Sequence, residues 1–223
     1  MEQNRSNALS QNVLLDIQFN PDYSVTAHQG TEFDPIMLSV SLSTIERLST
    51  TCSQSINIGN LEKFFSYSKG KLLSFEKSAD SLRCKCFDQI SAWSDIEHFP
   101  KCESTCLPLI ATLPEITQHL DTLKSVLSYG VRKQSTNQWQ FESKRSEWSP
   151  QLLQATGMVV MQVNMLLENG GYPHSRLCLY FESAIFWVWA VKDGRYCFAI
   201  VDRKITDADL EAVLSCGEAF VLT

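Results

Sequence analysis

The stretch "SAIFWVWAVKDGRYCFAIV", residues 183–201, is the most densely apolar part of the chain. Asp193-Gly194 is a dipeptide that two-residue hairpin turns prefer, because both central positions of such a turn need a positive φ. A turn centred there pairs Trp189 with Phe198 and puts the aromatic side chains on one face of two strands. The other face is mostly Ala, Cys and Val. Because neither face is polar, we expect this hairpin in the middle of a sheet that is covered on both faces.

The flanking segments predict helices. Ser149-Pro150 is typical of a helix start, and Gly170-Gly171 of a helix end, so a helix is expected over 150–169. Apolar residues cover more than half of its circumference, which indicates burial on more than one side. "HSRLCLYFES" (174–183) predicts a strand. After the hairpin, Thr206 and Asp209 form a capping box, and Gly217 is expected to end the last helix.

A weaker copy of this order occurs in the first half. Two strands are expected within residues 12–28, and Asp34-Pro35 begins a helix through "IMLSVSLSTIERLS". "SINIG" (55–59) is then expected as a strand, followed by a hairpin that turns at Lys69-Gly70, and "ADSLRCKCFDQISAW" (79–93) as a helix. Between the copies, a helix is expected over 113–129 with Gly130 as its end, and "NQWQFES" (137–143) as a strand.

These elements predict an α+β fold, with antiparallel sheets and helices on both faces. The predicted organisation is a disordered N-terminus at 1–11, a first α/β unit at 12–100 and a second at 101–223.

The order strand, strand, long helix, three strands, helix resembles the roadblock/dynein light chain fold, best over 149–216 and less closely over 12–97. The related longin fold has a similar pattern. The resemblance implies a five-stranded antiparallel sheet between helices, and dimerisation through the long helix and its neighbouring strand. Two such units in one chain would form that dimer internally. The resemblance also implies noncatalytic roles, as scaffolds or as subunits that regulate small GTPases, trafficking or motor complexes.

Composition narrows the class of partner and compartment. The net charge of -6 argues against general nucleic-acid binding, which needs a basic face. The polar N-terminus has no apolar core of a secretory signal, and no apolar run is long enough to span a membrane. The eight cysteines are therefore expected as reduced thiols, and the protein as cytoplasmic.

No catalytic motif is evident. The sequence has no Walker-type loop and no G-x-S-x-G elbow, and its four histidines are scattered. The strongest metal candidate is Cys84, Cys86, Cys102 and Cys106, with His98 between the pairs. Its spacing is not that of two C-x2-C knuckles, and two cysteines at i and i+2 of a helix point to different sides. We expect ordinary cysteines and no catalytic, cofactor-binding or metal-binding residues.

The sequence therefore predicts a noncatalytic adaptor or regulatory subunit that assembles with other proteins, a small GTPase among them. Its expected partner surface is the helix over 150–169 with the strand over 176–182. Two alternatives stay open: a zinc-stabilised module built on the cysteine cluster, and a small-ligand sensor with the aromatic sheet face as its pocket wall.

Overall fold

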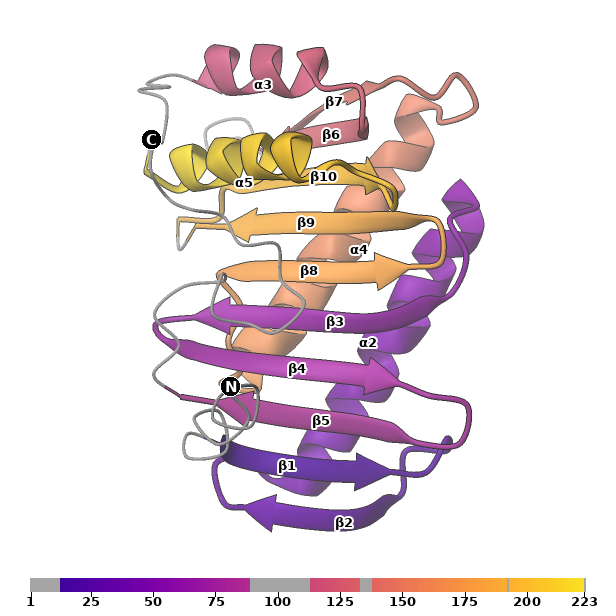
Figure 1. Cartoon of the computed structure of the whole chain (residues 1–223), viewed down its shortest axis with the longest axis vertical. Helices are drawn as coiled ribbons and strands as arrows, with labels where there is room; N and C mark the ends of the chain where they lie inside the picture. The colour runs from indigo at the N-terminus through magenta and orange to yellow at the C-terminus, as the bar shows by residue number, and fades with distance from the viewer. Residues whose placement is uncertain (1–12, 89–112, 133–137, 192, 223) are drawn as a thin grey trace, which may run out of the picture.

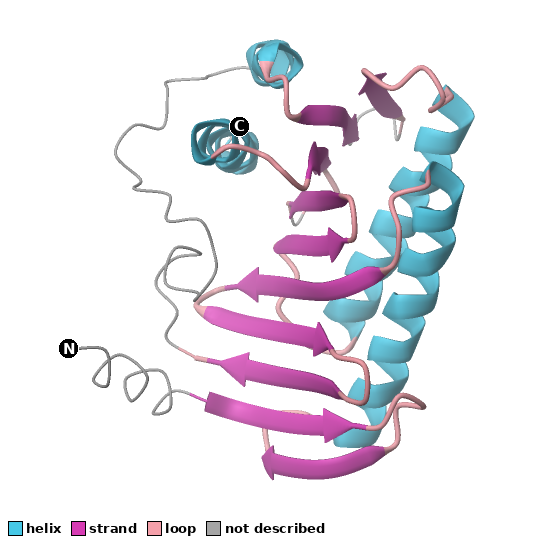
Figure 2. Ribbon diagram, turned by 45° about the vertical axis from the view of Figure 1, so that its right-hand side comes forward, coloured by secondary structure: helices cyan, strands magenta, loops and turns pink. Residues whose placement is uncertain are grey.

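A computed structural model describes residues 13–88, 113–132, 138–191 and 193–222. Its elements follow in the order β1 (Val13–Phe19), β2 (Val25–Gly30), α2 (Pro35–Ile56), β3 (Leu61–Ser68), β4 (Lys71–Lys77), β5 (Leu82–Phe87), α3 (Leu113–Thr122), β6 (Val126–Arg132), β7 (Trp139–Ser143), α4 (Pro150–Asn169), β8 (Arg176–Phe181), β9 (Ala184–Ala190), β10 (Tyr196–Asp202) and α5 (Asp207–Leu222). The strands form one antiparallel sheet, with α2 and α4 on one face and α3 and α5 on the other (Figures 1 and 2). This confirms the predicted fold class.

The strand order is the same when it is read inward from either edge of the sheet. It runs β2-β1-β5-β4-β3 from one edge and β7-β6-β10-β9-β8 from the other. The two series meet where β3 pairs antiparallel with β8, next to the contact between α2 and α4 (Figure 1). The two series therefore meet through one strand and one long helix from each. The predicted unit boundaries stay predictions, and segment 1–11 lies outside the described residues.

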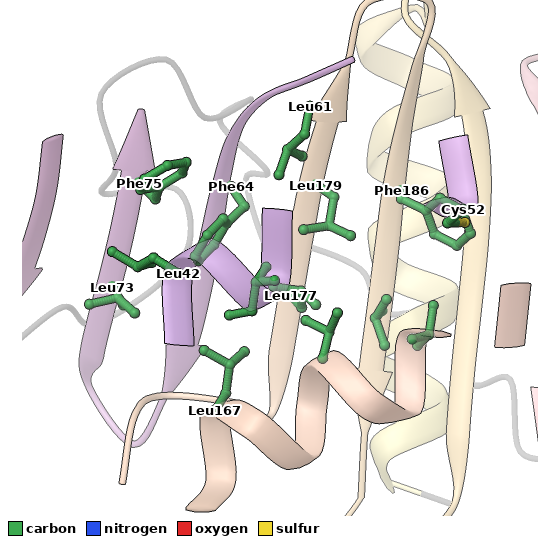
Figure 3. Packing of buried hydrophobic residues seen from close by; sticks show 14 of the residues in the cluster. Leu42, Cys52, Leu61, Phe64, Leu73, Phe75, Leu167, Leu177, Leu179 and Phe186 are labelled. Atoms are coloured by element: carbon green, nitrogen blue, oxygen red, sulfur yellow. The ribbon is translucent and has the colours of Figure 1, made fainter. Parts of the chain in front are cut away.

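Two apolar cores lie on opposite faces of the sheet. In the first, Leu42 of α2 and Leu167 of α4 lie near Phe64 and Leu73 of the sheet, and Phe186 lies farther along the sheet beside Cys52 (Figure 3). In the second, the residues come from the opposite face and from α3 and α5: Ile116, Leu120, Tyr129, Trp187, Trp189, Cys197, Leu210, Val213 and Phe220. The hairpin β9–β10 contributes to both cores, which explains why it has no polar face.

The hairpin register differs by one residue from the prediction. Trp189 lies opposite Cys197, and Val188 opposite Phe198. The reason is the turn: the N–H of Val191 donates to the carbonyl of Arg195, so three residues separate this last pair instead of two. A three-residue loop in place of a two-residue loop shifts the pairing of β9 and β10 by one position. Because side chains alternate between the faces of a sheet, each residue of β10 then shares a face with different residues of β9 than predicted. The tryptophans therefore share their face with Cys197 and Ala199 and pack under α5.

Two predicted elements of the first half are wrong. Residues 82–87 form strand β5, not part of a helix over 79–93; Cys84 and Cys86 are buried, while Arg83 on the opposite face is exposed. This alternation is the period of a strand. The predicted strand over 55–59 is also wrong, because α2 continues to Ile56 and ends at Asn57 with φ 54°.

Two glycines expected as helix ends lie inside elements. The helix predicted over 113–129 ends at Thr122, and Gly130 is part of β6, where a Cβ would lie 2.5 Å from the ring of Phe198. Gly217 lies inside α5, where a Cβ would lie 1.8 Å from the indole of Trp189. Both positions lack a side chain because a large ring occupies the space. Within the described residues, no helix combines the length and apolar character needed to cross a membrane.

Candidate protein-docking face

Helices α2 and α4 start in the same way. The carboxylate of Asp34 accepts the N–H of Ile36 at 2.8 Å, and the hydroxyl of Ser149 accepts the N–H of Leu152 at 3.3 Å. A proline follows each cap in the first turn, where a missing N–H costs no hydrogen bond. The sequence predicted both starts correctly, and they fix where each helix begins on the sheet.

The two helices run antiparallel. The thiol of Cys52, late in α2, lies 3.8 Å from the hydroxyl of Thr156, early in α4. At one end of the pair, the indole N–H of Trp148 donates to the carbonyl of Ile56 at 3.1 Å. At the opposite end, the rings of Phe33 and Tyr172 make an edge contact with centroids 4.8 Å apart. These contacts hold both ends of the pair, which lies along one face of the sheet (Figure 2).

The inner face of the pair is apolar at helical spacing, as a helix packed on a sheet requires. The residues that face the sheet include Leu38, Leu42, Ile45 and Ile56 of α2 and Leu153, Val160, Val163 and Leu167 of α4.

The outer face of the pair exposes large apolar side chains. Five of them leave between 47% and 70% of their surface accessible: Ile36, Met37 and Val40 of α2, and Met158 and Met165 of α4. Single exposed apolar residues are ordinary, but a group of them on one two-helix face is typical of a binding surface. Methionine side chains are flexible and adapt to the shape of a partner. We call this surface the outer helix face.

Few charges interrupt the outer helix face. Among the 22 residues of α2 only Glu46 and Arg47 are charged, and among the 20 of α4 only Glu168. For comparison, 20% of the whole chain is charged. Glu46 is already engaged, because its carboxylate accepts the hydroxyl of Tyr23 and pairs with Lys77. Depletion of charge is the compositional mark of the centre of protein interfaces.

Burial keeps the nearby ionisable groups neutral. It raises the pKa of Tyr23, and the hydrogen bond to Glu46 raises it further. Burial also raises the pKa of the Cys52 thiol to about 11. Neither side chain is therefore ionised near neutral pH.

The predicted partner surface is only partly available. The outer edge of β8 pairs with β3, from Leu61 opposite Phe181 to Tyr67 opposite Arg176, and one side of α4 packs against α2. The strand over 176–182 is therefore an interface inside the chain and not a free docking edge. What remains exposed is the outer side of α4.

The cysteine cluster is only partly described. Cys84 and Cys86 lie on β5 and point to the same side, into the core under α2, instead of to different sides of a helix. Burial raises the pKa of both thiols, that of Cys86 to about 12, which disfavours the thiolate that zinc binds. His98, Cys102 and Cys106 lie outside the described residues. Within the part of the chain that the structure describes, no three His, Cys, Asp or Glu side chains form a potential metal site.

The aromatic sheet face does not form the wall of a ligand pocket. Trp187 and Trp189 are 0% and 1% exposed, stack on each other with centroids 6.2 Å apart, and are covered by α5. The pocket that the sensor alternative placed here is therefore excluded by packing.

Sequence reasoning missed the outer helix face. It named the helix over 150–169 as a partner surface but did not single out Met158, Met165 or the exposed apolar residues of α2. The signal that was available is the near absence of charged residues from α2 and α4, since the exposed side of an ordinary surface helix is rich in them.

The fold and this face define an α+β protein with one continuous antiparallel sheet, a two-helix layer with few charges on one side and a second helical layer on the other. No protein-family model matches the chain, and no curated protein sequence matches it. Among solved structures, MglB of Myxococcus xanthus is similar over 56% of this chain and 96% of its own length, with a TM-score of 0.36 and 10% sequence identity.

Proposed function

We propose that the protein is a noncatalytic adaptor or regulatory subunit that binds a partner protein on the outer helix face. The observation that carries this proposal is the exposed group of Ile36, Met37, Val40, Met158 and Met165 on two nearly uncharged helices. Burying apolar side chains without burying unpaired charge is what favours association.

The outer helix face is preformed. Both helices are capped, their ends are held by Trp148 and by the contact between Phe33 and Tyr172, and their inner faces are fixed in the core. A partner would therefore meet an ordered surface and would not have to order it, which lowers the free-energy cost of binding.

The partner class that we propose is a small GTPase. It rests on the pattern-level resemblance to roadblock proteins, whose members act on such partners. The buried thiols support a role without catalysis, since their raised pKa values keep Cys52, Cys84, Cys178 and Cys197 from acting as nucleophiles.

A binding experiment tests both parts of the proposal. Small GTPases of the same host, loaded with GDP or with GTP, are titrated into the full chain by calorimetry. One of them should bind, and Val40→Glu combined with Met165→Glu should weaken binding by about tenfold or more, because each substitution buries a charge. Gln118→Glu, an exposed substitution in α3 on the opposite face of the sheet, is the matched control.

The outcomes separate the two parts. If a GTPase binds but the double variant binds equally well, the outer helix face is not the docking site. If no GTPase of the host binds in either nucleotide state, the proposed partner class is wrong. All three substituted residues are exposed, so thermal unfolding should show little loss of stability in either variant.

A further inference from the structure

A cavity of about 470 Å³ opens at the end of the helix pair where α2 ends and α4 begins. It is bordered by residues 56–58, by the segment before α4, by the turn between β8 and β9, and by the residues that follow β10. Its volume is within the range of small-molecule sites, roughly 300–1,000 Å³. The outer helix face does not include it.

The opposite end of the helix pair is filled. Pro35 and Pro150 begin the two helices, and Leu61 and Arg176 begin the strands that follow, so position 57 corresponds to position 172. Tyr172 is buried, and its ring packs against Phe33. At the end with the cavity, the corresponding residue is Asn57, which is exposed.

Part of the lining is apolar and fixed in place. Ile56 and Leu127 supply aliphatic surface, and Trp148 supplies an indole. The indole is held by its hydrogen bond to the carbonyl of Ile56, and Trp148 is only 7% exposed. Ile56 is 2% exposed, so it and the indole form a fixed floor, and the more accessible Leu127 supplies apolar surface that a ligand group can cover.

Both negatively and positively charged side chains line the cavity. The carboxylate of Glu182 accepts one hydrogen bond from Asn60, and that of Asp202 accepts one from the backbone N–H of Lys204. Each carboxylate keeps acceptor capacity, because two oxygens provide about four sites. Both residues line the cavity.

The basic side chains that line the cavity differ in how many hydrogen-bond and ion-pair partners they already have. Arg203 is held by Glu62 at 2.9 Å and by the carbonyl of Phe181 at 2.5 Å. Arg145 has only a loose, exposed pair with Glu147 at 3.8 Å. The ammonium of Lys204 has no ion pair or hydrogen bond to any residue that the structure describes.

We propose that this cavity binds a free α-amino acid with an apolar side chain. Glu182 and Asp202 receive the ligand's ammonium group, Lys204 and Arg145 receive its carboxylate, and its side chain lies against Trp148, Ile56 and Leu127. A simple acid would contact Lys204 and Arg145 alone, and a simple amine would contact Glu182 and Asp202 alone, so each would make fewer charged hydrogen bonds than the amino acid. This ligand site goes beyond the proposed docking function and does not depend on it.

The test uses L-leucine and two analogues that each lack one charged group, 4-methylpentanoate and 3-methylbutylamine. Binding to the full chain is measured by calorimetry and by the change in tryptophan fluorescence. L-Leucine or L-phenylalanine should bind saturably below about 10 mM, and both analogues should bind about tenfold or more weakly, since each loses a charged hydrogen bond.

Variants locate the site. Lys204→Gln and Glu182→Gln should each weaken amino-acid binding by about tenfold, and Lys69→Gln, an exposed lysine in the turn at the opposite end of β3, should not. Lys204 has no described partner to lose, so its variant should keep the stability of the native chain. The proposal is overturned if no apolar amino acid binds, if an analogue binds as well as the amino acid, or if Lys204→Gln binds normally. This assay does not measure GTPase binding, so a failure of every GTPase to bind would leave the amino-acid result unaffected.

Discussion

Replacement of Gly217 by alanine should destabilise the protein, although glycine to alanine inside a helix is ordinarily favourable by about 1 kcal/mol. A Cβ at this position would lie 1.8 Å from one indole atom of Trp189 and 2.2 Å from two others. Carbon atoms in contact are normally about 3.5–4.0 Å apart. Trp189 is 1% exposed and stacks on Trp187, so it has no free space to enter.

Helix α5 must therefore move off the sheet, or Trp189 must leave its rotamer. Overpacking of this kind costs about 1–3 kcal/mol, and we expect Gly217→Ala to lower the free energy of unfolding by that amount. The sign of this change in the free energy of unfolding is decisive, because helix propensity alone predicts that Gly217→Ala stabilises the protein.

Urea unfolding followed by tryptophan fluorescence and by circular dichroism measures the effect. Ser215→Ala, in the same helix, is the matched control and should change the free energy of unfolding by less than about 0.5 kcal/mol. Trp189→Leu makes room for the added methyl group, so Gly217→Ala should cost less in that background. If Gly217→Ala is as stable as the native chain or more so, the close packing of α5 on Trp189 is wrong.

Two further predictions concern charge. The guanidinium of Arg176 donates to both carboxylate oxygens of Glu218 and ties α5 to β8, so Glu218→Gln should lower the free energy of unfolding by about 1–2 kcal/mol. Lys71→Gln, which removes an exposed pair, should change it by less than about 0.5 kcal/mol in the same urea titration; equal effects would contradict the difference in burial. Burial raises the pKa of Cys86 and Tyr129 to about 12, whereas unfolded thiols ionise near about pH 8.5, so the unfolded chain binds fewer protons at alkaline pH. The free energy of unfolding should therefore fall as pH rises from about 8.5 to 10, and a urea midpoint that rises over this interval would refute the burial of these groups.

Local signals in the sequence were enough for most elements of the fold. Asp34-Pro35 and Ser149-Pro150 predicted both long helices, because a capping side chain and a following proline act within one turn of the chain. Lys69-Gly70 predicted the β3–β4 hairpin, since both residues have the positive φ that a tight turn needs. These features depend on neighbours in sequence, so they can be read without knowledge of the fold.

The features that failed depend on residues distant in sequence. Gly130 and Gly217 look like helix ends until the rings of Phe198 and Trp189 are placed beside them. The hairpin register depended on one residue of loop length, which composition alone does not specify. Strand β5 is a different case, because its signal is local. Apolar and basic residues alternate in its sequence LRCKCF, which is typical of a strand, but the segment was interpreted as a helix.

The candidate docking face was hidden for a related reason. Periodicity shows which side of a helix is apolar, but α2 and α4 have apolar residues on the exposed side as well as the buried side. Both helices lie on one face of the sheet (Figure 2), and the exposed fraction of each side chain in that arrangement shows which methionines remain outside.

The dense hairpin now explains a difference between the two ends of the sheet. Strand β9 is buried along its whole length because α4 covers one face and α5 the other. In the other half of the sheet, β5 and β1 bury one face under α2, and on the opposite face Arg83 and Lys85 pair with Asp16. A strand that needs two covers is apolar throughout, and a strand with one solvated face alternates. The apolar excess at 183–201 is therefore accounted for by internal packing, and the surfaces left for a partner or ligand are the outer helix face and the cavity at the end of the helix pair.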